Sequence, residues 1–218
     1  MALCTQPLTV CLLLLAAGAA PAQQSAPIVQ PGAPGQPGRR LTEATVRTPP
    51  KAPFSADVEF MQGMIMHHSQ AVDMVALLRT RGKSPVLKSF GEKIAISQTD
   101  EIGFMKRWLE SRGKPTTMQM DHSKMSAADM KNMNMLMPGM LTPQQMAALA
   151  RAKGAQFDHL FLTGMIQHHG GALTMVEGLF NTPGAGQEPV LFDFATDIEN
   201  TQSAEIKIMR GMLDKEKK

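Results

Sequence analysis

Two pairs of adjacent histidines, each preceded by Gly-Met-Ile, carry the side chains of this sequence best suited to chemistry. Gly-Met-Ile-Met-His-His spans residues 63–68, and Gly-Met-Ile-Gln-His-His spans residues 164–169. Another methionine follows each pair, Met74 in the first copy and Met175 in the second. At about 100° per residue, the methionines and histidines of each copy share one helix face. We therefore expect eight side chains directed at least partly into a core: Met64, His67, His68, Met74, Met165, His168, His169 and Met175.

These side chains have two possible roles, packing and metal ligation. A single methionine on such a face is more often flexible filler of a core. Burying four imidazoles, however, is unfavourable unless each finds a partner, and packing gives no reason to repeat that arrangement. Because histidine is the commonest metal-binding side chain, the repeated pairs favour metal ligation.

The ligand types indicate which metal. Thioether sulfur is soft and favours Cu(I), whereas imidazole also suits zinc, nickel and iron. A mixed methionine and histidine site therefore favours copper, with silver as a mimic. A di-iron centre in a helical bundle would need Glu-x-x-His on two helices, and no glutamate stands three residues before a histidine. Glu101 and Glu205 are candidates to accept hydrogen bonds from the imidazoles, with simple contacts between helices as the alternative.

A second methionine-rich segment lies between the two copies. Residues 118–140 hold eight of the 19 methionines, at spacings too irregular for one helical stripe. They belong to a predicted loop over residues 114–141. The methionine-rich segment could be a loop without a role in metal binding. We favour the other interpretation, in which it is a flexible segment that captures soft metals.

The elements that must position the histidines are four predicted helices. The first begins near Ser55, a candidate N-cap, and ends at Gly82. The second begins at Ser84-Pro85 and ends near Gly113. The third begins with the capping-box pattern of residues 142–145 and ends near residue 182, with a possible break near Gly154. The fourth begins near residues 188–189 and continues close to the end of the chain.

The helices repeat as hairpins. The first and third share the histidine motif at an offset of 101 residues, and the second and fourth share a pattern at an offset of 104. Residues Gln98, Glu101, Met105 and Leu109 in one match Gln202, Glu205, Met209 and Leu213 in the other. Two copies of one hairpin predict an all-α, four-helix bundle with approximate internal two-fold symmetry.

The remaining segments indicate export. Residues 1–22 combine a short apolar stretch with a small-x-small cleavage pattern and predict a signal peptide, although no basic residue precedes the apolar stretch. They contain both cysteines, Cys4 and Cys11, so the exported protein would have no thiol. The composition of residues 23–53 predicts a disordered, Pro/Gly-rich tether, and residues 54–218 are expected to form the bundle. We expect a periplasmic or extracellular location and no membrane insertion after signal removal.

The charge distribution argues against nucleic acid as a partner. The net charge of +3 comes from residues 23–53, which hold four basic residues and one acidic residue, so the rest of the chain is neutral. Without a cluster of lysine and arginine, we expect no binding to nucleic acid.

The doubled Gly-Met-Ile-x-His-His motif, the methionine after each copy and the matched partner helices resemble the bacterial family named domain of unknown function 305. The resemblance covers roughly residues 54–213. It implies a ferritin-like four-helix bundle, frequent export, and copper binding linked to copper resistance in some members. It carries over to the eight candidate ligands above and adds Met105 and Met209 from the partner helices.

We therefore predict a copper-binding protein and not an enzyme. It would sequester, buffer or transfer Cu(I), with Cu(II) or Ag(I) as further ions, and a copper exporter or another copper-handling protein is a candidate partner. Two alternatives remain at this stage: a metal-dependent redox enzyme on the same bundle, and a structural bundle without metal. The sequence supplies no evident nucleophile, general base or cofactor motif for catalysis.

Overall fold

The computed structural model describes residues 28–30, 39–41, 54–118 and 136–216. The predicted signal peptide lies outside the described residues, as does most of the predicted tether. The chain divides into two compact units, residues 1–51 and 52–218. In the first unit, β1 (Ile28–Gln30) pairs in antiparallel register with β2 (Arg39–Leu41), a hairpin that the sequence did not predict.

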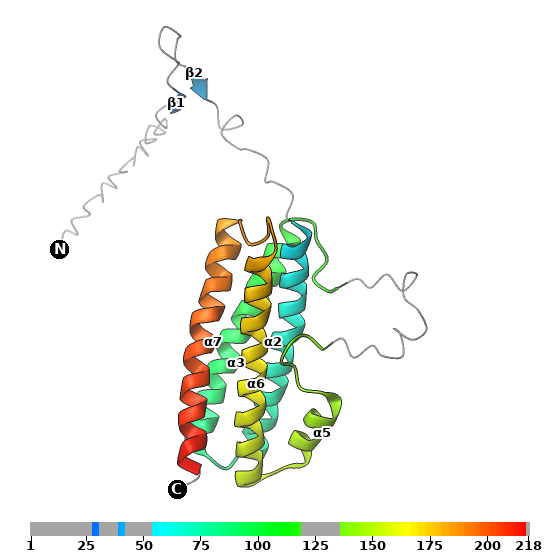
Figure 1. Ribbon diagram of the computed structural model, residues 1–218, viewed down its shortest axis with the longest axis vertical. Coiled ribbons are helices and arrows are strands. Elements are labelled where there is room, and N and C mark those ends of the chain that lie inside the picture. Colours follow the sequence, from blue (N-terminus) through cyan, green and yellow to red (C-terminus); the bar gives the residue numbers. More distant parts are fainter. Residues whose placement is uncertain (1–27, 31–38, 42–53, 119–135, 217–218) are drawn as a thin grey trace, which may run out of the picture. The chain divides into compact units, whose positions relative to one another are not determined.

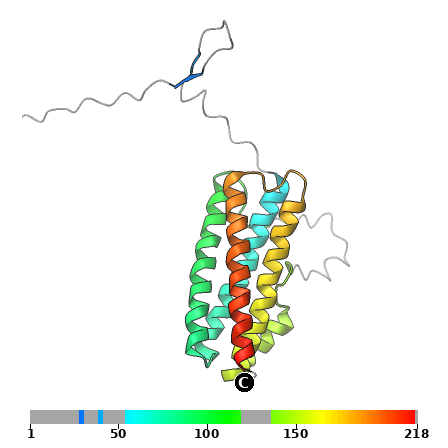
Figure 2. The ribbon, with the colours of Figure 1, turned by 60° about the vertical axis from the view of Figure 1, so that its left-hand side comes forward.

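The second unit is an all-α bundle of two helical hairpins, as predicted. Its four long helices are α2 (Ser55–Arg81), α3 (Pro85–Glu110), α6 (Gly154–Asn181) and α7 (Pro189–Glu216). Helix α2 packs on α3 and α6 packs on α7, while α2 and α6 join the two hairpins. Figures 1 and 2 show the four helices side by side.

The region predicted as one third helix consists of two helices. The short helix α5 (Pro143–Arg151) packs on α6 and α2, and Ala152 and Lys153 separate it from α6. The break falls at the expected place because Gly154 takes a left-handed φ of 63° that other residues rarely adopt.

Side-chain caps mark the starts of α3 and α5. The Ser84 hydroxyl accepts a hydrogen bond from the Leu87 amide, and Thr142 and Gln145 form the predicted capping box. The prediction that Ser55 caps α2 was wrong. Phe54 occupies the N-cap and Ser55 is the first helical residue.

Two aspartates at matching positions of the repeat join the hairpins. The Asp57 carboxylate, near the start of α2, accepts a hydrogen bond from the Gly186 amide in the α6–α7 loop, at 2.7 Å. The Asp158 carboxylate, near the start of α6, accepts from the amides of Lys83 and Ser84 in the α2–α3 loop, at 2.9 and 2.8 Å. Each hairpin therefore supplies the acceptor for the other hairpin's loop.

The core consists of two apolar clusters that contain different halves of α2 and α6. One contains the α2 side chains before the histidines, such as Phe60, and the α6 side chains after them, such as Val176. The other contains the later α2 side chains, such as Val75, and the earlier α6 side chains, such as Phe161. The histidine pairs stand between these two groups in both helices, near the middle of the bundle.

Candidate metal centre

All four histidines of the repeated motif are buried without solvent exposure, at 0%. The sequence predicted that they point only partly inward. The His67 and His168 rings, from different hairpins, lie with their centroids 3.8 Å apart. Each also neighbours the second histidine of its own pair, with ring centroids 6.2 Å apart. The two pairs form one cluster at the contact between α2 and α6, and we call it the histidine quartet.

The Nε2 atom of every imidazole in the quartet has an oxygen partner. His67 Nε2 lies 3.0 Å from the carbonyl oxygen of Pro138, and His168 Nε2 lies 2.9 Å from that of His67. His68 Nε2 lies 2.6 Å from Glu101, and His169 Nε2 lies 2.6 Å from Glu205. A carbonyl oxygen or an ionised carboxylate can only accept, so Nε2 carries the proton and donates in all four. Glu101 and Glu205 are thus acceptors for imidazole N–H groups, which is the first of the two roles that the sequence left open for them.

The Nδ1 atom of every imidazole in the quartet is buried and has no hydrogen-bond partner among the described residues. In a neutral imidazole protonated at Nε2, Nδ1 holds a lone pair. Buried polar atoms without partners are rare in native proteins and call for an explanation such as a bound ion. Four at equivalent positions of a repeat fit the donor set of a metal-binding centre, in which the second nitrogen is fixed by an outer hydrogen bond.

Burial keeps two of these histidines uncharged. The pKa of His67 falls from 6.5 to about 3, chiefly because the ring is buried and also because His68 lies beside it, while the hydrogen bond with Pro138 acts in the opposite direction. Burial also lowers the pKa of His168 well below its usual value, with further lowering from the other three histidines. Both imidazoles are therefore neutral near pH 7, the form that binds metals.

The six methionines of the predicted set divide equally between the two apolar clusters. Met64 and Met105 are fully buried in one cluster, and the half-buried Met175 packs against it. Met74, Met165 and Met209 are fully buried in the other. Met64 and Met74 share α2 yet lie on opposite sides of the histidines. Each group of three thus draws on both hairpins.

Two glutamines that the sequence analysis did not single out as ligands lie on the inward faces of α3 and α7. Gln98 stands one helical turn before Glu101, and Gln202 stands one turn before Glu205. Each is 2% exposed, and neither amide has a partner among the described residues. Their equivalence in the repeat was the signal that could have identified them.

A segment over residues 136–141 lies across α2 and α6, and we call it the strap. Gln70 on α2 donates to the Leu141 carbonyl and accepts from the Leu141 amide, at 3.0 and 2.7 Å. Gln167 on α6 donates to the carbonyl oxygens of Gly139 and Met140. The strap also supplies the Pro138 carbonyl to His67. Of the predicted capture loop, residues 119–135 lie outside the described residues.

The arrangement differs from common nitrogen and oxygen metal centres. In the part of the chain that the structure describes, no group of three or more histidine, cysteine or carboxylate side chains has the geometry to hold a metal. A metal held by the quartet must therefore gain ligands from the neighbouring thioethers or from rotation of side chains.

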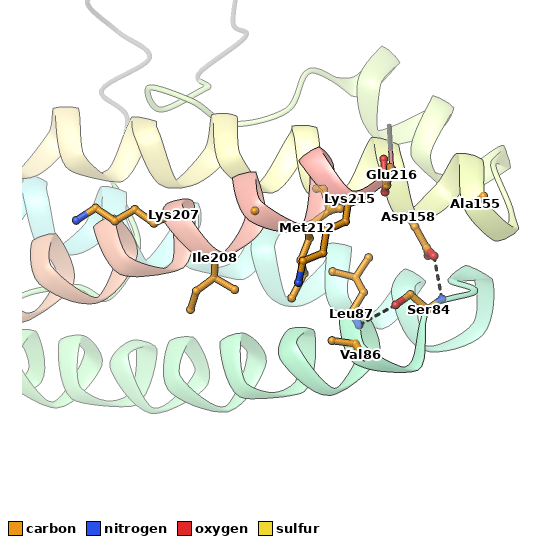
Figure 3. A pocket seen from close by; sticks show the side chains of 12 residues that line it. Ser84, Val86, Leu87, Ala155, Asp158, Lys207, Ile208, Met212, Lys215 and Glu216 are labelled. Carbon is orange, nitrogen blue, oxygen red and sulfur yellow. Dashed lines mark hydrogen bonds between the residues drawn. The ribbon is translucent and has the colours of Figure 1, made fainter. Parts of the chain in front are cut away.

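An apolar groove with a volume of about 920 Å³ lies apart from the quartet (Figure 3). Its lining includes Val86 and Leu87 from the start of α3 and Ile208 and Met212 from α7. None of the ten predicted ligands lines it. The groove therefore does not belong to the candidate metal centre.

The fold and the quartet define a class of protein: a bundle of two repeated hairpins with imidazoles and thioethers buried between them. The chain belongs to the family described as domain of unknown function (DUF305), whose model matches residues 57–213. This confirms the resemblance noted in the sequence.

Solved structures of the family are similar to this chain. A DUF305 fragment from Deinococcus radiodurans is 28% identical, with a TM-score of 0.63, covering 76% of this chain and 99% of that one. A presumed secreted DUF305 protein from Streptomyces coelicolor is 29% identical, with a TM-score of 0.61, and the match covers 73% of this chain and 93% of that one. CopM in its Cu(I)-bound form is 28% identical, with a TM-score of 0.55, and the match covers 73% of this chain and 96% of CopM. CopM has also been solved with Cu(II) and with silver.

A curated relative matches a smaller part of the chain. The uncharacterised protein L153 of Acanthamoeba polyphaga mimivirus is 39% identical over 59 residues, which span 27% of this chain and 39% of the viral protein. Within the described residues, no helix has the length and apolar character needed to cross a membrane.

Proposed function

We propose that this protein binds copper, Cu(I) foremost, at the histidine quartet and its flanking methionines. The observation that carries the proposal is the set of four buried Nδ1 atoms without partners, each on an imidazole whose Nε2 is already bonded. The ten residues that we assign as ligands are Met64, His67, His68, Met74, Met105, Met165, His168, His169, Met175 and Met209.

The donor chemistry favours copper over the other metals that imidazole binds. Three thioethers lie on each side of the quartet, and thioether sulfur selects soft ions such as Cu(I). The Cu(I)-bound and silver-bound structures of CopM support this choice. Cu(II) is a further ion that the imidazoles could hold, in line with the Cu(II)-bound form of CopM.

We propose a role in copper sequestration, buffering or transfer outside the cytoplasm. The export-type residues 1–22 and the similarity to a presumed secreted family member support this location. The four histidines and five of the six methionines are buried without solvent exposure, and this burial supports a binding role. A copper exporter or another copper-handling protein would receive or deliver the ion.

The test is anaerobic titration of the protein with Cu(I) against a competing chelator. Cys4→Ser and Cys11→Ser are included throughout, so that methionine and histidine are the only soft donors. We expect tight binding by this parent and its loss when His67, His68, His168 and His169 are all replaced by glutamine. His159→Gln is the matched control, because His159 is exposed and its ring bonds Glu216 on the surface.

Folding and ligation are measured separately from affinity. Circular dichroism establishes that the glutamine variant keeps its helices, and X-ray absorption of the loaded parent reports sulfur and nitrogen around copper. If a folded glutamine variant binds Cu(I) as tightly as the parent, the assignment of the site is wrong. Steady turnover of a cuprous or ferrous substrate by the loaded protein would contradict a pure binding role.

A further inference from the structure

Two methionine side chains from distant parts of the chain meet over Gly63 on α2. The Met137 Sδ lies 3.3 Å from the position that a Cβ atom would take at this glycine, and the Met175 Cε lies 3.4 Å from the same position. The methyl carbon of Met175 is bonded directly to its sulfur, so both thioethers lie against one side of Gly63. Glycine at this position leaves the space that both side chains occupy.

The strap holds Met137 in this place. The next residue, Pro138, offers its carbonyl oxygen to His67 at 3.0 Å, and His67 stands one turn beyond Gly63 on α2. Leu141 is fixed by its two hydrogen bonds with Gln70. Hydrogen bonds of neighbouring strap residues therefore hold Met137 against the same face of α2 that carries the quartet.

The thioethers at Gly63 are closer to solvent than those of the buried centre. Met137 and Met175 are both half-buried, whereas Met64, the residue after Gly63, has no exposure. Met175 also packs against the apolar cluster that contains Met64 and Met105. The pair consequently lies between solvent and one group of buried methionines.

The equivalent position in the second hairpin lacks this pair. At Gly164, the Met74 Cε lies 3.3 Å from the corresponding Cβ position, as Met175 does at Gly63. The place of Met137 is taken there by Leu141, whose Cδ2 lies 3.0 Å away. Leu141 and Met74 are both buried. The internal symmetry of the bundle is thus broken at this point. Two partly exposed thioethers lie against Gly63, whereas a buried leucine side chain takes the place of one of them at Gly164.

We propose that Met137 joins Met175, the half-buried member of the ten assigned ligands, in a partly exposed capture site for a monovalent soft cation, Cu(I) or Ag(I), at the edge of the buried centre. Thioethers suit this ion because they are soft and have no proton to lose on binding. The half-buried Met66 stands three residues after Gly63 on α2, a spacing that puts two residues on one helix face, and it is a candidate for a third thioether. The inference rests on the proposed function, because the captured ion would pass to the adjacent Met64 and Met105.

The experiment titrates Ag(I) into protein with ¹³C-labelled methionine methyl groups, again with Cys4→Ser and Cys11→Ser. We expect the methyl signals of Met137 and Met175 to shift together at the first additions of Ag(I), before those of Met64 and Met105. Met137→Leu recreates the arrangement at Gly164. We expect it to abolish the early shift of Met175 and to weaken this site at least about tenfold, the loss that even an outer partner of a metal ligand can cause.

Two matched variants act as controls. Met140→Leu removes a thioether from the same strap and leaves the early shifts unchanged. Leu141→Met adds a thioether at the position equivalent to Met137. Because this position and Met74 are both buried, we expect the Met74 methyl signal to shift only after those of Met137 and Met175, as in the parent. Circular dichroism checks that each variant keeps the helices of the parent.

The outcomes separate this inference from the proposed function. The quartet variant with four glutamines should retain the early shifts of Met137 and Met175 while losing tight binding in the core. Early shifts of Met175 that persist in Met137→Leu would overturn the capture site and leave the buried centre standing. A parent that binds no Ag(I) or Cu(I) would overturn both.

Discussion

The imidazole rings of His67 and His168 lie with their centroids 3.8 Å apart and their planes 39° from parallel, and they come from different hairpins. His168 Nε2 donates to the main-chain carbonyl of His67 itself. The two residues occupy equivalent positions in the repeat, so the approximate two-fold axis passes between them. Two of the proposed ligands therefore form part of the contact between the hairpins.

Acid should destabilise the metal-free protein through His67. The folded protein lowers the pKa of His67 to about 3, whereas an unfolded imidazole has a pKa of about 6.5. Between these values the unfolded state binds the additional proton, so the free energy of unfolding falls as the pH falls from about 6.5 towards 3. The expected slope is about 1.4 kcal/mol per pH unit from this residue, and His168 adds to it in the same direction.

Urea unfolding of the metal-free protein, followed by circular dichroism at about pH 7.5 and about pH 5, measures this slope. His67→Gln should reduce the difference between the two pH values, because glutamine does not titrate. Equal differences in the parent and in His67→Gln would show that His67 is not the group responsible.

The glutamates that bond His68 and His169 should tune metal affinity. Glu101 and Glu205 each approach an Nε2 atom at 2.6 Å, and such partners orient a ligand and raise its basicity. We expect Glu101→Gln with Glu205→Gln to weaken Cu(I) binding by about 10- to 100-fold. Competition with a chelator measures the affinity, and ¹⁵N spectra of the histidines report which nitrogen carries the proton.

Glu110→Gln provides the comparison for this pair, because Glu110 is exposed near the end of α3. It should leave both the affinity and the histidine spectra unchanged. An unaltered affinity in the double glutamine variant would mean that the two contacts serve only to join helices.

Much of this fold could be predicted from sequence because its signals are local. Ser84-Pro85 and the capping box at residues 142–145 mark helix starts through hydrogen bonds within a few residues, and such patterns are visible in the chain itself. The repeat at an offset of 101 residues revealed the two hairpins. The burial of Met64 and Met165 followed from the same helical spacing.

The division of the proposed methionine ligands between the two apolar clusters could not be predicted from helical spacing. Met64 and Met74 share a helix face, but ten residues of α-helix separate them by about 15 Å along the axis. Which cluster each joins depends on the antiparallel packing of α2 on α6. The strap was missed for a similar reason: Pro138 meets His67 across 71 positions, and no periodic pattern records that contact.

Asp158 should stabilise the bundle by holding the loop of the other hairpin. It is 6% exposed, and its carboxylate accepts from the amides of Lys83 and Ser84. Asp158→Ala leaves two loop amides without these acceptors, and we expect it to lower the free energy of unfolding by about 1–3 kcal/mol. Asp57→Ala should act in the same direction, since Asp57 bonds the Gly186 amide.

Urea unfolding at constant pH measures both variants. Asp73→Ala is the control, because Asp73 is exposed on α2, and substitutions of that kind usually change stability by less than about 0.5 kcal/mol. A loss in Asp158→Ala no larger than in Asp73→Ala would show that the bonds between the hairpins contribute little.

Adjacent glycines on α6 should respond in opposite ways to alanine. A Cβ atom at Gly171 would lie 1.8 Å from the Pro138 carbonyl oxygen and 2.5 Å from the Gly139 Cα, both main-chain atoms of the strap. Gly171→Ala must displace the strap, and we expect a loss of at least about 1–3 kcal/mol in stability. At Gly170 nothing lies within 4 Å of the Cβ position, so Gly170→Ala should gain about 0.5–1 kcal/mol from helix propensity. Thermal and urea unfolding of the two variants measure the difference, and the opposite order would mean that the strap does not rest on α6 at Gly171.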